Sequence, residues 1–188
     1  DVVYYNDSKG TNTDASKKAL EAMENKTVLI AGGYDKGSEY DDWVEAFGDK
    51  IKCLVLLGAT ADKIEETARR HGFTNIRRVK SLQEAVVTAS ENADAGETVL
   101  LSPACASWDM FKSYEERGKL FKQYVKELRL KEAERMSRAT YSASPPAQSK
   151  KYITRSKSFV RKKTKKSYFD YSLMFLIIFM LAFGLLML

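Results

Sequence analysis

Three short segments of the sequence combine lysine, hydroxyl and glycine residues in a way that could bind a small anion. They are residues 6–12 (NDSKGTN), 32–37 (GGYDKG) and 102–107 (SPACAS). Lys9 and Lys36 supply mobile positive charge, and Thr11 and Ser107 supply hydroxyl donors. Each segment follows an apolar run and precedes an expected helix, whose free N–H groups favour anions. Together these groups would suit a small dicarboxylate or a phosphate.

Other kinds of site find little support in the residue types. Glycine, asparagine, aspartate and serine are common in any strand-to-helix turn, so each segment alone could be structural. Segment 32–37 fails the phosphate-loop test, because Ser38 stands where that motif requires lysine, and it is not a GxGxxG fingerprint. No metal site is expected, since His71 is the only histidine and Cys53 and Cys105 lie far apart. We expect Cys105 to be a buried thiol rather than a nucleophile.

The elements that must position these groups alternate between strand and helix over residues 1–130. The strand-like runs are residues 2–5, 27–31, 52–57, 76–79 and 98–101. This alternation predicts an α/β fold, a Rossmann-like and mostly parallel sheet with helices on both faces. Ligands bind such a sheet beyond the carboxyl ends of its strands, so we expect the three segments to share one edge.

Helix signals fall between the strand-like runs. Ser81 with Glu84 forms a capping box that opens a helix, and Thr60 is expected to cap a helix that ends before Gly72. A last helix carries one apolar face, formed by Leu120, Phe121, Tyr124, Val125 and Leu128.

Charge is distributed unevenly along the chain. The whole sequence holds 31 Lys and Arg against 25 Asp and Glu, a net charge of +6. Residues 135–188 contain eleven basic residues and one acid (11 − 1 = +10), and residues 1–134 contain 20 and 24 (20 − 24 = −4). A nucleic-acid binder is excluded, because it would need positive charge on the folded part. Two cysteines cannot build a disulfide framework, which indicates a reducing compartment.

The tail differs from residues 1–130 in composition. Residues 131–167 are rich in Ser, Thr, Lys and Arg and predict a disordered basic linker. Nine basic residues between 150 and 166 mark the cytoplasmic side of a membrane and would attract anionic lipid. Residues 168–188 are expected to begin a transmembrane helix. We expect this helix to be truncated, since the charge-free run 173–188 is shorter than the about 20 residues that a span needs. Both ends of the chain are expected to be cut.

Residues 1–128 resemble the D-glutamate-adding ligases of the Mur ligase family. The resemblance is carried by NDSKGTN, by AGGYDKG after a strand, and by LLSPACASWDMFKSYEERGKLF. It implies a C-terminal domain, here residues 1–130, that closes over a central ATPase domain and delivers D-glutamate. It further implies that Thr11, Lys36 and Ser107 hold the two D-glutamate carboxylates, with the backbone at Tyr114 assisting. Asp7 and Lys9 match catalytic positions that face the nucleotide.

The reaction that this resemblance implies belongs to peptidoglycan synthesis. ATP phosphorylates the carboxylate of UDP-N-acetylmuramoyl-L-alanine, and the amine of D-glutamate attacks the acyl phosphate. The central domain that mainly binds ATP and Mg²⁺ lies outside this chain, so we expect no catalysis by this chain alone. Tyr114 stands where the family often has phenylalanine, which is harmless if only the backbone acts.

The tail has a resemblance of its own. Residues 166–188 are similar to the cytoplasmic start and first transmembrane helix of FtsW-like cell-division proteins of the SEDS family. Three hypotheses follow. The first is a glutamate-delivering ligase domain in the cytoplasm, whose tail enters the membrane if the fusion is natural. The second is a membrane-integral glycan polymerase with an inactive ligase remnant, and the third is a generic nucleotide-binding domain with a membrane anchor. Lys9, Thr11, Lys36 and Ser107 together favour the first, and the missing glycine fingerprint weakens the third.

Overall fold

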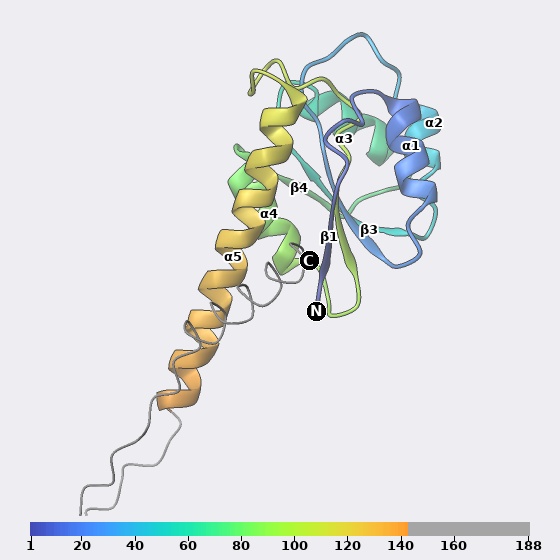
Figure 1. Cartoon of the computed structure of the whole chain (residues 1–188). Helices are drawn as coiled ribbons and strands as arrows, with labels where there is room; N and C mark the ends of the chain where they lie inside the picture. Colours follow the sequence, from blue (N-terminus) through green and yellow to red (C-terminus); the bar gives the residue numbers. More distant parts are fainter. Residues whose placement is uncertain (143–188) are drawn as a thin grey trace, which may run out of the picture. The chain divides into compact units, whose positions relative to one another are not determined.

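The computed structural model describes residues 1–142, and these form a parallel five-stranded sheet with helices on both faces (Figure 1). The strands are β1 (Val3–Asn6), β2 (Thr27–Ala31), β3 (Ile51–Leu56), β4 (Ile76–Arg78) and β5 (Thr98–Leu101). Their order in the sheet is β1-β5-β2-β3-β4, and every pair is parallel. The α/β fold predicted from the sequence is confirmed for these residues.

Alternating side chains of the strands fill two cores, because successive residues of a strand point to opposite faces. The helices are α1 (Thr13–Glu21), α2 (Asp41–Glu45), α3 (Ala61–Arg70), α4 (Leu82–Glu91) and α5 (Tyr114–Ser142). Leu29 and Leu54 belong to the core under α1, α2 and α3, whereas Val28 and Val55 belong to the core under α4 and α5. In Figure 1 the first group of helices lies on the right and the second on the left.

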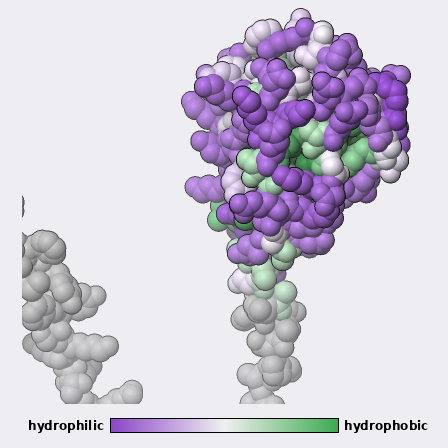
Figure 2. Space-filling view, turned by 90° about the vertical axis from the view of Figure 1, so that its right-hand side faces the viewer, coloured by the Kyte–Doolittle hydropathy of each residue, from purple (hydrophilic) through white to green (hydrophobic). Residues whose placement is uncertain are grey.

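The core under α1 to α3 contains a run of aromatic rings. Trp43 packs edge-on against Phe47 at 4.8 Å between ring centroids, and Phe47 packs against Phe73 at 5.4 Å. Edge-to-face packing of this kind stabilises a core beyond its area burial. The outer surface on this side is mostly hydrophilic, and hydrophobic residues show through it near the middle and along the lower part (Figure 2).

The helix starts agree with the sequence in part. The Ser81 hydroxyl accepts a hydrogen bond from the Glu84 backbone N–H at 3.1 Å, as the capping box predicts. Thr60 precedes α3 as expected, but its hydroxyl does not cap the helix. It accepts a hydrogen bond from the Gly33 N–H at 3.1 Å instead, and so it joins the loop after β2 to the start of α3.

Helix α5 is longer than the sequence analysis predicted. It begins at Tyr114 and continues to Ser142, so residues 131–142 are helical and the prediction of a disordered linker from residue 131 was wrong for them. Their mixed charges allow an exposed helix without an apolar face. No helix within residues 1–142 is long and apolar enough to cross a membrane. The rest of the predicted linker, the basic cluster at 150–166 and the expected membrane segment at 168–188 lie outside the described residues.

Candidate functional site

The three segments identified in the sequence meet at the carboxyl edge of the sheet, at the top of Figure 1. The register pairs Leu101 with both Asn6 and Ile30, so β1, β5 and β2 end side by side. Beyond the strands, the Tyr34 N–H donates to the Ala106 carbonyl at 2.9 Å. This bond ties the loop after β2 to the loop after β5.

Gly33 allows these two loops to lie in contact. Its φ is +147°, and a Cβ atom there would lie 2.2 Å from the Ala106 carbonyl oxygen. Any side chain at this position would push the two loops apart. The glycine pair in segment 32–37 therefore serves close backbone approach rather than phosphate binding.

Lys36 and Thr11 are brought together from different loops. The Lys36 Nζ atom donates to the Thr11 carbonyl oxygen at 3.4 Å, and it lies 5.4 Å from the centroid of the Trp108 ring. No carboxylate lies within ion-pair distance of Lys36 or of Lys9 in the part of the chain that the structure describes. Both ammonium groups are therefore available to an anionic ligand.

Ser107 lies at the inner wall of the same site. The residue is only 2% exposed, and its carbonyl accepts hydrogen bonds from the N–H groups of Met110 and Phe111. Its hydroxyl has no partner among residues 1–142. No buried side-chain oxygen or nitrogen of residues 1–142 lacks a hydrogen-bond partner, so the Ser107 hydroxyl oxygen keeps some contact with solvent and is accessible to a ligand.

Asp7 is held by a chain of buried hydrogen bonds. Its Oδ2 atom accepts from the Ser102 hydroxyl at 2.7 Å, that hydroxyl lies 2.8 Å from the Ser16 hydroxyl, and the Trp43 Nε1–H donates to Ser16 at 2.9 Å. Ser16, Ser102 and Trp43 are buried. A Cβ atom on Gly10 would lie 2.3 Å from the Asp7 Oδ2 atom, so glycine leaves room for this carboxylate.

Tyr114 stands at the first position of α5. Its carbonyl accepts a hydrogen bond from the Ser8 hydroxyl at 2.7 Å. Its backbone N–H has no acceptor within the described residues. Because the first N–H groups of a helix have no partner in the helix itself, this group is the one that a carboxylate could reach.

Arg117 is a residue of the site that the sequence analysis did not identify. It is 2% exposed and bridges the loops after β1 and β5. Its Nη2 atom donates to the Ser8 carbonyl at 2.9 Å and its Nε to the Ser8 hydroxyl at 3.0 Å, while Nη1 reaches the carbonyls of Cys105 and Ala106 at 3.3 and 3.4 Å. Burial lowers the pKa of the Arg117 guanidinium to about 10, so it stays protonated at neutral pH.

The remaining reactive groups near the site are structural. Cys105 is buried, and its sulfur lies 3.2 Å from the hydroxyls of both Tyr40 and Thr60. Burial raises the pKa of the Cys105 thiol, which opposes a nucleophilic role. No cluster of His, Cys, Asp and Glu in residues 1–142 could hold a metal ion.

This arrangement defines a class of protein: an α/β domain whose free cations and hydroxyls gather at the carboxyl edge of its sheet. A family model described as the glutamate ligase domain of Mur ligases matches residues 1–105. The chain therefore belongs to the Mur ligase family and carries its glutamate ligase domain.

Curated relatives agree with this family. The UDP-N-acetylmuramoylalanine–D-glutamate ligase of Lachnoclostridium phytofermentans is 63% identical over 128 residues, which cover 68% of this chain and 28% of that protein. The ligase of the same name from Thermoanaerobacter sp. is 58% identical over 130 residues, which cover 68% of this chain and 29% of that protein. The ligase of Lachnospira eligens is 56% identical over 127 residues, which cover 68% of this chain and 28% of that protein. The chain thus spans less than a third of the length of these relatives.

Proposed function

We propose that residues 1–130 form the D-glutamate-binding domain of a UDP-N-acetylmuramoylalanine–D-glutamate ligase. The observation that carries this proposal is that two hydrogen-bonded loops present an ammonium without a carboxylate partner, Lys36, and a hydroxyl without a hydrogen-bond partner, Ser107. Relatives of that name align with this part of the chain at 53 to 63% identity.

A dicarboxylate suits the kinds of donor that these residues offer. In the proposed mode Lys36 and Ser107 bind one carboxylate, and Thr11 with the Tyr114 backbone N–H binds the other. Charge-assisted hydrogen bonds of this kind fix the orientation of a ligand as well as its affinity. Holding D-glutamate in place makes the attack of its amine on the activated carboxylate of UDP-N-acetylmuramoyl-L-alanine effectively unimolecular.

Asp7 and Lys9 are proposed to act at the nucleotide side of the reaction. Lys9 is exposed, and its ammonium could approach a phosphate group. The Asp7 carboxylate is oriented by Ser102 and could bind a metal-bound water or a ribose hydroxyl. ATP and Mg²⁺ would be held mainly by a central domain, so this chain alone should not hydrolyse ATP. ATP turnover by purified residues 1–142 would contradict this.

The test of the D-glutamate site is Lys36→Ala in the complete ligase. We expect the KM for D-glutamate to rise about tenfold or more, because a charge-assisted contact is lost, while the KM for ATP changes little. Arg69→Ala, which removes an exposed cation on α3, is the matched control and should leave both constants unchanged. Equal increases of both KM values in Lys36→Ala would refute the assignment.

A second proposal concerns the tail. The nine basic residues between 150 and 166, followed by the apolar run 173–188, favour a cytoplasmic domain whose tail contacts an anionic membrane and enters it as an FtsW-like segment. The 188-residue chain should co-sediment with vesicles containing phosphatidylglycerol, and residues 1–142 should not. Equal sedimentation of the 188-residue chain and of residues 1–142 would contradict this proposal. The complete reading frame would distinguish a natural fusion from two adjacent genes.

A further inference from the structure

Lys36 has an acidic neighbour in sequence with which it does not pair. The Asp35 carboxylate accepts a hydrogen bond from the Gly37 N–H at 2.8 Å and lies 3.9 Å from the Lys63 Nζ atom. These two contacts hold Asp35 on the α3 side of its loop. Lys36 is turned to the other side, toward Thr11 and Trp108.

The indole that Lys36 meets is unusually exposed. Trp108 is 65% exposed, and its ring packs against the Tyr34 ring at 5.5 Å between centroids. The two rings stand on the loops that the Tyr34–Ala106 hydrogen bond joins. An exposed tryptophan of this kind contributes little to the core, so its position beside the candidate site calls for another explanation.

An aromatic face and a carboxylate hold a cation in different ways. The face of an indole attracts an ammonium group through its quadrupole but carries no net charge. A carboxylate would bind the ammonium more tightly and would neutralise it. An ammonium that rests on an aromatic face is therefore localised and still able to bind an anion.

We propose that Trp108 is a positioning residue that holds the Lys36 ammonium at the rim of the site, ready for a substrate carboxylate. This inference rests on the proposed D-glutamate site and deepens it. Lys63 contributes indirectly, because it helps to keep Asp35 away from Lys36. Trp108 itself need not touch the substrate.

The geometry can be tested on the 188-residue chain without any ligand. Lysine labelled with ¹³C at the ε position gives one methylene signal per residue, and Lys36→Met identifies the signal of Lys36. We expect this signal to lie upfield of the others because of the indole ring current, to stay upfield in Trp108→Phe, and to lose the shift in Trp108→Leu. A Lys36 signal unchanged by Trp108→Leu would overturn the proposal.

The functional consequence can be tested by D-glutamate titration of the same variants. We expect Trp108→Phe to bind within about twofold of the parent chain and Trp108→Leu to bind about threefold more weakly. Trp108→Glu should weaken binding about tenfold or more, because the new carboxylate pairs with Lys36 and competes with the ligand. Val87→Ala, on the exposed face of α4, is the control and should bind as the parent does.

The Lys36→Met background separates a positioning role from a direct one. If Trp108 acts through Lys36, Trp108→Leu should have no further effect on binding in that background. An equal effect in both backgrounds would mean that Trp108 acts independently of Lys36, and the proposal would be wrong. If the parent chain and the complete ligase both fail to bind D-glutamate, the proposed function fails, while the ring-current experiment still decides the geometry.

Discussion

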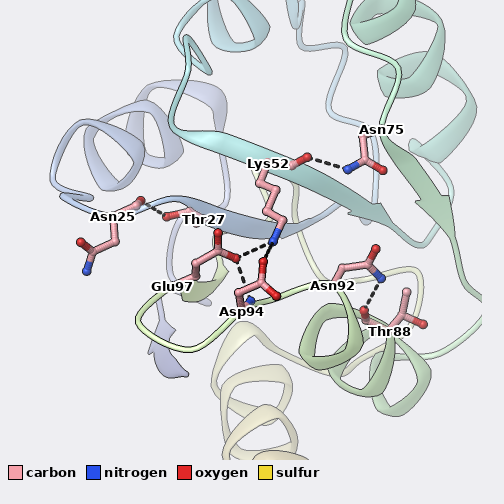
Figure 3. A network of polar contacts seen from close by, with 8 residues as sticks. All are labelled: Asn25, Thr27, Lys52, Asn75, Thr88, Asn92, Asp94 and Glu97. Carbon is pink, nitrogen blue, oxygen red and sulfur yellow. Dashed lines mark hydrogen bonds and ion pairs between the residues drawn. The ribbon is translucent and has the colours of Figure 1, made fainter. Parts of the chain in front are cut away.

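The two edges of the sheet use their charges in opposite ways. At the amino edge the Lys52 Nζ atom lies 2.6 Å from Asp94 Oδ2 and 2.8 Å from Glu97 Oε2 (Figure 3). At the carboxyl edge, Lys9, Lys36 and Arg117 have no carboxylate within ion-pair distance among residues 1–142.

The same contrast extends to the neutral polar groups. Around Lys52, the Asn75 side chain donates to the Lys52 carbonyl at 2.7 Å, and the Thr27 hydroxyl donates to the Asn25 carbonyl at 2.9 Å (Figure 3). At the carboxyl edge the Ser107 hydroxyl has no such partner in the described structure. The paired groups around Lys52 stabilise the fold, whereas the free groups of Lys9, Lys36 and Ser107 are those that the proposed ligand site requires.

The largest expected effect is that of Arg117→Met at the carboxyl edge. The substitution removes the donors that satisfy the Ser8, Cys105 and Ala106 carbonyls, so we expect the free energy of unfolding to fall by about 3 kcal/mol. Urea denaturation measures this. Arg117→Lys, which keeps the charge but not the planar fork, should recover only part of the loss. A loss below about 1 kcal/mol for Arg117→Met would show that Arg117 is not the link between these loops.

A smaller effect is expected at Gly10, beneath the Asp7 carboxylate. Gly10→Ala should lower the free energy of unfolding by about 2 kcal/mol, because its Cβ would displace Asp7 from Ser102. In a Ser102→Ala background the added cost should be smaller, since that hydrogen bond is already absent. Additive effects of the two substitutions in urea denaturation would contradict the coupling.

Lys52 and Lys36 provide the most direct test of the contrast between the edges. Lys52→Met should cost about 1 kcal/mol of stability, less at high salt, and leave D-glutamate binding unchanged. Lys36→Met should change stability by less than about 0.5 kcal/mol and weaken D-glutamate binding about tenfold. Both variants are measured by urea denaturation and by D-glutamate titration. A variant that lost both stability and D-glutamate binding would contradict the contrast between the two edges.

The smallest effect concerns an ion pair outside both edges. Hydrogen bonds from Arg70 and then His71 lower the pKa of Asp41 from 3.8 to about 2. The contribution of this cluster to stability is therefore complete above pH 4 and lost as the pH falls toward 2. Melting curves should show a smaller drop over this interval for Asp41→Asn than for the parent chain. Identical acid profiles would mean that the pair has no net effect on stability.

Local patterns in the sequence determine most of this fold. All five strands were predicted, because each is a short β-rich run bounded by turn residues. The three central strands β2, β3 and β5 are also apolar and buried on both faces, whereas the edge strands β1 and β4 are largely exposed. The Ser81–Glu84 capping box was also predicted, since both partners lie within one turn. Placing segments 6–12, 32–37 and 102–107 at one edge required only the rule for parallel sheets.

Contacts between residues far apart in the sequence could not be predicted in this way. Arg117 bonds to Ser8 across 109 positions, and the Thr60 hydroxyl serves Gly33 rather than its own helix. A signal for Arg117 did exist: it lies four residues before Phe121 and eight before Val125, on the buried face of α5. A basic residue in such a stripe indicates a buried cation with specific acceptors.

Because α5 is long, a small tilt at its first turn produces a large displacement at its other end. Its first turn touches the loops of the site through Tyr114 and Arg117, and its 29 residues span about 43 Å. A rigid rod of this length that tilts by about 5° moves its far end by about 4 Å. A spin label at Arg138→Cys, an exposed position near that far end, would report loop movements that are too small to follow at the site itself. The native thiols of Cys53 and Cys105 are buried and should not compete for the label.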